Sequence, residues 1–107
     1  MKPNEYTLSY LPLFEQDLTN TKRYIRDTLG NKQAADKLVD NVEKAIFNKL
    51  KMPLSFEPYS SAVKRKYPYY RIYIGNYVVF YVVINKIMEI RRLIYGKRNF
   101  DELLPKD

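Results

Sequence analysis

The residues of this sequence that could do chemistry are cations and tyrosines, and most lie in its second half. Between residues 64 and 98 nine cations stand against the single anion Glu89. The nine are Lys64, Arg65, Lys66, Arg71, Lys86, Arg91, Arg92, Lys97 and Arg98. Eight of the eleven tyrosines fall between residues 59 and 95. Because cations hold phosphate oxygens and tyrosine rings stack on bases, the pattern indicates a polyanionic partner and favours single-stranded RNA or DNA.

Both features also have a simpler explanation. The excess of cations, which gives the chain a net charge of +7, keeps many proteins soluble without binding anything. Tyrosines are good strand formers, so many of them can serve packing alone. The sequence pattern leaves these alternatives open.

The composition restricts the available chemistry. With no histidine and no cysteine, acid–base steps would depend on carboxylates, lysine, tyrosine or groups of the substrate, and no thiolate site is possible. We therefore expect no metal and no cofactor. The length of 107 residues predicts a single domain over residues 1–107. Because no signal peptide and no apolar run near ~18 residues is present, we expect a soluble cytoplasmic protein without a membrane partner.

The first half of the chain predicts a strand followed by two helices. Residues 6–11 alternate as a strand does, and Pro12 stands where a helix can begin. One apolar stripe follows it, formed by Phe14, Leu18, Ile25 and Leu29. Gly30 is suited to end that helix and Asn31 to cap the next. The second stripe is formed by Ala35, Leu38, Val42, Ile46 and Leu50. So short a turn predicts an antiparallel helical hairpin.

The second half predicts a loop over residues 53–68, three strands and a short helix. Strands are expected over residues 70–74, 77–84 and 87–95, joined by turns at Gly75-Asn76 and Asn85-Lys86. The second of these strands is apolar on both faces, which is typical of a central strand covered on both sides. The phase of the third is ambiguous, because Arg92 shares parity with the apolar Ile90 and Ile94.

The expected fold is α+β, a helical hairpin packed on a small, mainly antiparallel sheet in the order β-α-α-β-β-β-α. Two segments, "YRIYIGNYVVFYVV" and "IMEIRRLIYGKRNFDELL", resemble the C-terminal sheet signature of the RelE/ParE toxin superfamily. Upstream, "DLTNTKRYI" and "LGNKQAADKL" are similar to its helical hairpin. The resemblance implies a RelE/ParE-like toxin of a bacterial type II toxin–antitoxin system, held inactive by a cognate antitoxin.

The superfamily contains two activities that share the fold. RelE-like members cut mRNA on the ribosome, whereas ParE-like members bind DNA gyrase and are not nucleases. For cleavage, the resemblance places the phosphate-gripping cations at Arg71 and Arg98. A site rearranged from that of the RelE nucleases would use Tyr95, Tyr73 or Lys97 as its proton-handling group. A guanidinium suits the first task because it stays charged and binds phosphate oxygens in pairs. The expected RNA-binding residues are Lys64, Arg65, Lys66 and Lys97.

Three positions depart from the RelE nucleases that the chain resembles. Val78 stands where those nucleases have an arginine, Leu104 where they have a tyrosine, and Tyr73 where they have a cation. These departures are compatible with two alternatives: the nuclease site is rearranged, or nuclease activity has been lost. Because the basic, tyrosine-rich zone favours RNA, we expect a metal-independent, ribosome-dependent mRNA endoribonuclease ahead of the alternative, inhibition of DNA gyrase. We expect the antitoxin to lie across the helices and the sheet edge, with acidic residues near Arg71 and Arg98.

Overall fold

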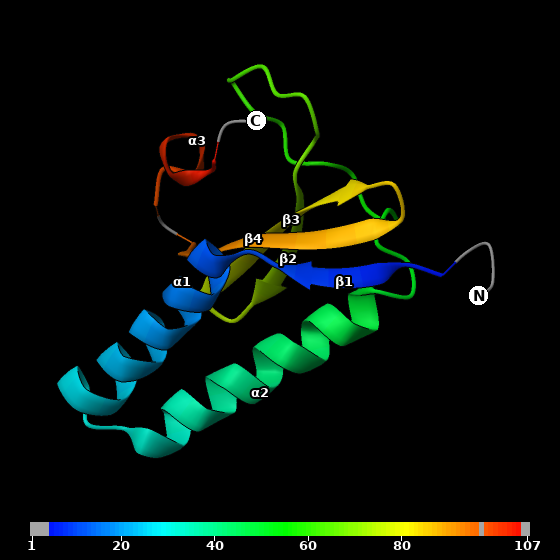
Figure 1. The fold of residues 1–107 in the computed structure, drawn as a ribbon. Coiled ribbons are helices and arrows are strands. Elements are labelled where there is room, and N and C mark those ends of the chain that lie inside the picture. Colours follow the sequence, from blue (N-terminus) through cyan, green and yellow to red (C-terminus); the bar gives the residue numbers. More distant parts are fainter. Residues whose placement is uncertain (1–4, 97, 106–107) are drawn as a thin grey trace.

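Four strands and two long helices make up most of the fold (Figure 1), as a computed structural model of residues 5–96 and 98–105 shows. In chain order the elements are β1 (Thr7–Tyr10), α1 (Pro12–Arg23), a π-helical turn (Tyr24–Thr28), α2 (Lys32–Lys49), β2 (Tyr70–Ile74), β3 (Tyr77–Ile84), β4 (Ile87–Tyr95) and α3 (Phe100–Leu103). This is the predicted α+β class and the predicted order of elements. In this part of the chain no helix is long and apolar enough to cross a membrane.

The strands form one sheet in the order β1-β4-β3-β2. The β2–β3 and β3–β4 pairs are antiparallel, whereas β1 pairs with β4 in parallel. The predicted mainly antiparallel sheet is therefore confirmed. Both turns of the meander have the backbone that a two-residue hairpin requires: Gly75 has φ of 55°, and Asn85 and Lys86 have φ of 49° and 66°.

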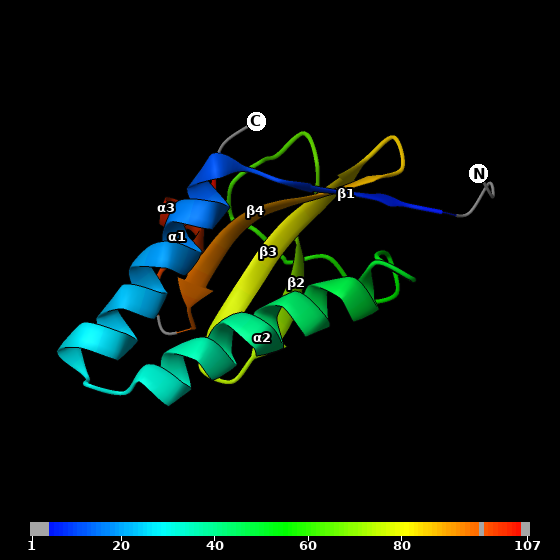
Figure 2. The same cartoon turned by 60° about the horizontal axis from the view of Figure 1, so that its bottom comes forward.

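Helices α1 and α2 lie on one face of the sheet and diverge from the turn that joins them (Figures 1 and 2). Between them and the sheet lies the first core. Its buried members are Phe14, Val42, Ile46, Val79, Tyr81, Met88, Ile90 and Leu93. The stripes predicted for the two helices supply the helical side of this core, because residues three or four apart share one helix face.

A second core covers the opposite face of the sheet, where α3 and the loop before β2 pack. It is formed by Tyr69, Val78, Phe80, Val82, Ile94 and Leu104. Successive residues of β3 alternate between the two cores, which explains why that strand is apolar on both faces. The prediction of a central strand covered on both sides is confirmed.

A β-bulge resolves the ambiguous phase of β4. Phe80 pairs with Arg92 while the next residue, Tyr81, pairs with Ile90, so Arg91 is an extra residue in the ladder. The extra residue reverses the side-chain alternation beyond it. As a result, Ile90 and Leu93 both face the first core although their parity differs.

The end of the first helix differs from its predicted stripe. From Tyr24 to Thr28 the chain makes a π-helical turn, in which the Leu29 N–H donates to the Tyr24 carbonyl at 3.1 Å. A π-turn holds one residue more than an α-turn and so rotates the next residues about the helix axis. Leu29 is consequently 59% exposed rather than buried with Ile25. Asn31 caps α2 as predicted, because its side chain accepts a hydrogen bond from the Ala34 N–H at 3.0 Å.

Candidate partner-binding surfaces

Arg71 and Tyr73 project from β2 on the sheet face opposite the helical hairpin. Ile72 and Ile74, which alternate with them, pack against the first core. The Arg71 guanidinium carbon lies 5.5 Å from the ring centre of Tyr59 and 5.8 Å from that of Tyr73. The predicted grouping of Arg71 and Tyr73 on one face is therefore present.

Tyr95 projects to the other face, on the same side as the helical hairpin. It follows Leu93, a member of the first core, by two residues, and its ring meets the ring of Tyr77 at 5.6 Å and 62°. Arg98 lies beyond the end of β4, where it shares a groove with Tyr95. The structure thus separates Tyr95 from Tyr73 by the thickness of the sheet. Lys97 lies outside the described residues.

The first concave surface, which we name the edge groove, lies beside β2 and has a volume of about 730 Å³. It is lined by Lys49, Ser55, Phe56, Glu57, Arg71, Ile72 and Tyr73. Phe56 is 71% exposed and Tyr73 64% exposed. Lys49 holds its Nζ 3.7 Å from the centre of the Phe56 ring, and burial lowers the pKa of this ammonium. The edge groove therefore combines cations with exposed aromatic rings.

One border of the edge groove is an open strand edge. Among the strands of the described chain, β2 pairs only with β3. Ile74 and Tyr77 flank the two-residue turn and so form a hydrogen-bonded pair, which directs the peptide groups of Arg71 and Tyr73 outward. An edge of this kind can accept an extended segment of another chain.

The second concave surface, which we name the tyrosine groove, lies between α1, the β3–β4 pair and α3, and also measures about 730 Å³. Its lining includes Asn20, Tyr24, Asn76, Tyr77, Tyr95 and Arg98. Burial, together with the hydroxyls of Tyr95 and Tyr24, raises the pKa of Tyr77. Like any tyrosine near neutral pH, this residue carries its phenolic proton and can donate a hydrogen bond.

The one carboxylate that the described residues contribute to the tyrosine groove is already neutralised. Asp17 accepts two hydrogen bonds from the Arg92 guanidinium, at 2.7 and 2.9 Å, and a third from the Leu93 N–H at 3.0 Å. Arg92 also donates to the Leu103 carbonyl at 2.7 Å, which fastens α3 to the sheet. By contrast, the Arg98 guanidinium has no ion pair or hydrogen bond with residues 5–96 or 98–105. The free charge of this groove is positive.

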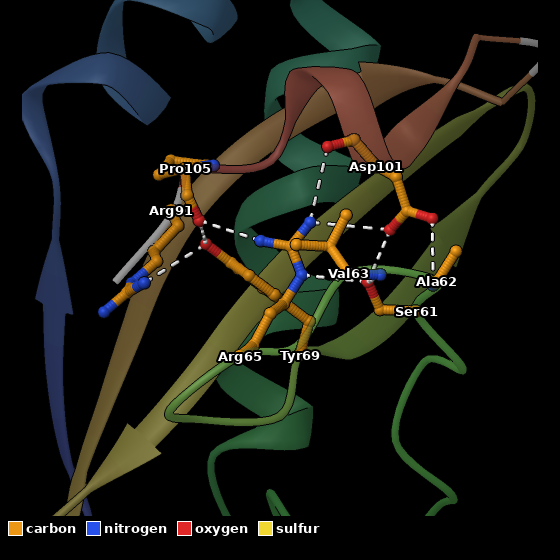
Figure 3. A network of polar contacts seen from close by, with 8 residues as sticks. All are labelled: Ser61, Ala62, Val63, Arg65, Tyr69, Arg91, Asp101 and Pro105. Atoms are coloured by element: carbon orange, nitrogen blue, oxygen red, sulfur yellow. Dashed lines mark hydrogen bonds and ion pairs between the residues drawn. The ribbon is translucent and has the colours of Figure 1, made fainter.

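Arg65, which was expected to contact RNA at the surface, has a buried side chain instead and is part of a network of polar contacts (Figure 3). Its side chain is only 4% exposed. It donates to Ser61 Oγ and to the Pro105 carbonyl, both at 3.0 Å, and to Asp101 Oδ1 and the Asp101 carbonyl, both at 3.4 Å. Tyr69 extends the network, because its hydroxyl donates to the same Pro105 carbonyl at 2.8 Å. Arg65 therefore holds the loop before β2 against α3.

The two lysines beside Arg65 lie at the surface instead. Lys64 and Lys66 are both exposed, and Lys66 Nζ lies 5.4 Å from the centre of the Tyr67 ring. The "KRK" segment thus splits into one internal anchor and two surface cations. Within the described part of the chain, no cluster of three or more carboxylates could hold a metal ion.

Sequence reasoning missed Tyr24 and Asn76 as groove residues. Tyr24 lies outside the apolar stripe of its helix and outside the basic zone, and it shares the groove with Tyr77 and Tyr95 at the end of α1, where the π-helical turn begins. Asn76 is part of a turn that the sequence identified for its backbone alone. In the sequence, the signal for Tyr24 was limited to a large aromatic residue on the polar side of a helix.

The fold and the two grooves define a small α+β protein with two concave surfaces that could receive partners. Among solved structures, the chain is similar to one titled "Chromosomal ParDE TA system from P. aeruginosa", with a TM-score of 0.72 and 14% identity. That match covers 88% of this chain and 99% of the other. No curated protein is significantly similar in sequence.

The family model that matches residues 8–100 is that of the ParE toxin of type II toxin–antitoxin systems, parDE. The chain belongs to this family and is thus a toxin of a type II toxin–antitoxin system, which implies a cognate antitoxin. The expectation of an mRNA endoribonuclease that inhibits translation is wrong, because the match is to the ParE branch. For that branch the sequence resemblance implies gyrase binding without nuclease activity.

Proposed function

We propose that this toxin inhibits DNA gyrase in the cytoplasm and is silenced there by its antitoxin. The observation that carries the proposal is the match to the ParE toxin family over residues 8–100. Gyrase is the target that the resemblance implies for ParE-like members, and binding a protein needs no acid–base group of the toxin.

The geometry of the residues first predicted to be catalytic supports this function. A nuclease must bring its charge-stabilising and proton-transfer groups to one phosphate. Here Arg71 and Tyr73 border one groove, while Tyr95 and Arg98 line another across the sheet. We assign these four residues to contacts with protein partners.

Two of the departures from RelE nucleases point the same way. Val78 and Leu104 are 1% and 2% exposed, and both belong to the second core. Neither position offers a side chain to a substrate. Their apolar identities serve packing, which leaves no trace of an RNA-cleaving site at these positions.

For the antitoxin we propose the edge groove as its main contact. The open edge of β2 can pair with an extended segment, and acidic side chains of that segment would meet Arg71 and Lys49. Exposed Phe56 and Tyr73 supply the apolar contacts. Replacing Arg71 with glutamate should weaken binding of the neighbouring gene's product by about tenfold or more, measured by titration calorimetry. Unchanged affinity would move the antitoxin to another surface.

Induced cells provide the test of the function. We expect plasmid DNA to lose negative supercoiling within the period of growth arrest, while primer extension shows intact messages. Cells carrying the same plasmid with a stop codon early in the toxin gene serve as the control. Cut messages beside normally supercoiled plasmid would overturn the proposal.

A further inference from the structure

The tyrosine groove has the form of a preformed binding site. Its volume of about 730 Å³ is within the range of roughly 300–1,000 Å³ that holds a small ligand or a few side chains. Helix α1, the β3–β4 pair and α3 build its walls, and the Asp17–Arg92 ion pair and the Arg92–Leu103 hydrogen bond join these elements. A site built from braced elements loses little entropy when a partner binds.

Its aromatic rim suits a protein partner. Tyr24 is 51% exposed and Tyr95 is 41% exposed, and Tyr77 packs edge-on against the latter. Within the described residues, none of these three hydroxyls makes a hydrogen bond. Tyrosine combines a large apolar ring with a polar end, and it is enriched among the residues that dominate binding energy at protein interfaces.

The charge of the groove selects an acidic group. Asp17 is neutralised by Arg92, whereas the Arg98 guanidinium has no partner in the described part of the chain. Arginine binds a carboxylate through two parallel hydrogen bonds. Nucleic acid is disfavoured, because a site for a phosphate backbone uses several cations together and this groove presents a single free one among the described residues.

We propose that the tyrosine groove binds an acidic surface loop of gyrase, with a carboxylate on Arg98 and an adjoining aliphatic or aromatic side chain between Tyr24 and Tyr95. This inference rests on the proposed function. It places the contact with gyrase in a different groove from the one proposed for the antitoxin. A concave site with fixed walls fits a loop that protrudes from a folded protein. An open strand edge fits an extended chain, which is why the edge groove is left to the antitoxin.

Binding of the full-length toxin to purified gyrase subunits, measured by biolayer interferometry without DNA, tests the assignment. Arg98→Glu and Tyr24→Ala should each weaken binding by about tenfold or more, since both remove central contacts. Arg98→Gln should weaken it less than Arg98→Glu because it removes the charge without reversing it. The matched controls are Lys86→Glu at the opposite end of β4 and Phe47→Ala on the outside of α2, and both should bind within about twofold of wild type.

The outcomes separate this inference from the proposed function. Wild-type affinity of Arg98→Glu and Tyr24→Ala for gyrase would overturn the assignment of the groove while the function stands. If the toxin binds gyrase only when DNA is present, the occupant of the groove is nucleic acid and the assignment is overturned. If the two variants lose binding to the antitoxin but keep binding to gyrase, the occupant is the antitoxin and the assignment is likewise overturned. A wild-type toxin that neither binds nor inhibits gyrase would overturn the function itself. Thermal unfolding of each variant verifies that its fold is intact. If Tyr24→Ala unfolds, Tyr24→Gln replaces it, because glutamine removes the ring but is a better helix former than serine or other short polar residues.

Discussion

At the scale of single residues, the Arg65 network ties the loop before β2 to the end of the described chain. Asp101 is its acidic partner and also accepts hydrogen bonds from Ser61 Oγ and, at 3.1 Å, from the Ala62 N–H. These hydrogen bonds lower the pKa of the Asp101 carboxyl. The bond from Ser61 has the largest effect, and those from Ala62 and Arg65 add to it. The network therefore links the stability of α3 to pH.

The sign of this linkage gives a prediction. A carboxyl whose folded pKa is lowered below the unfolded value of about 3.9 stabilises the fold above roughly pH 4, and that stability is lost as the pH falls through the folded pKa. Asp101→Asn should therefore flatten the fall in unfolding free energy below about pH 4, measured by urea titration at several pH values. Asp36→Asn, at an exposed ion pair with Lys22, is the control and should retain the wild-type slope. An Asp101→Asn profile parallel to wild type would contradict the assignment.

The phenol of Tyr81 makes the other decisive single contact. It is fully buried, and its hydroxyl donates to the Pro53 carbonyl at 2.5 Å, which holds the segment after α2 against the sheet. Tyr81→Phe would leave that carbonyl without its donor and should cost about 1–3 kcal/mol of unfolding free energy. Chemical denaturation provides the measurement. Tyr10→Phe, at a residue that is 40% exposed and whose hydroxyl makes no hydrogen bond in the described residues, should cost close to nothing. Equal effects of the two changes would refute this role.

At the scale of elements, the turn between β3 and β4 carries a conformational cost. Lys86 has φ of 66°, a left-handed conformation that costs an L-residue about 1–2 kcal/mol and glycine almost nothing. Lys86→Gly should therefore stabilise the protein by about 0.5–1 kcal/mol, allowing for the lost contact of its ammonium with the Tyr6 ring. The expected rise in Tm is roughly 3–6 °C by calorimetry. Lys86→Ala keeps the strained backbone and should not stabilise, so equal Tm values for the two variants would contradict the explanation.

The elements also show where sequence patterns stop being informative. Apolar stripes and turn residues predict α2, β2 and β3 well, because their periodicity continues without interruption. The bulge at Arg91 and the π-turn at Tyr24 each insert one residue into a regular repeat, and periodicity has no means of locating an insertion that packing decides. Both irregularities lie near the tyrosine groove. The sequence therefore predicted the fold around this groove but not the groove itself.

At the scale of the whole molecule, the sequence predicted the fold class, the order of elements and the superfamily. It could not predict how the basic zone would divide in space. In the sequence, the cations of the basic zone suggest a single site. In the fold they lie apart: Lys64 is at the surface and Arg65 is buried, while Arg71 lines the edge groove and Arg98 lines the tyrosine groove. The RNA-cleaving interpretation depended on their being together, and the match to ParE toxins corrects it.

Supercoiling of relaxed plasmid by purified gyrase, titrated with the purified toxin, tests the central claim most directly. We expect supercoiling to fall as toxin is added and to recover when the product of the neighbouring gene is added in equal amount. Toxin inactivated by heat serves as the control for nonspecific binding of a protein with a charge of +7. Full supercoiling in the presence of excess folded toxin would contradict the claim.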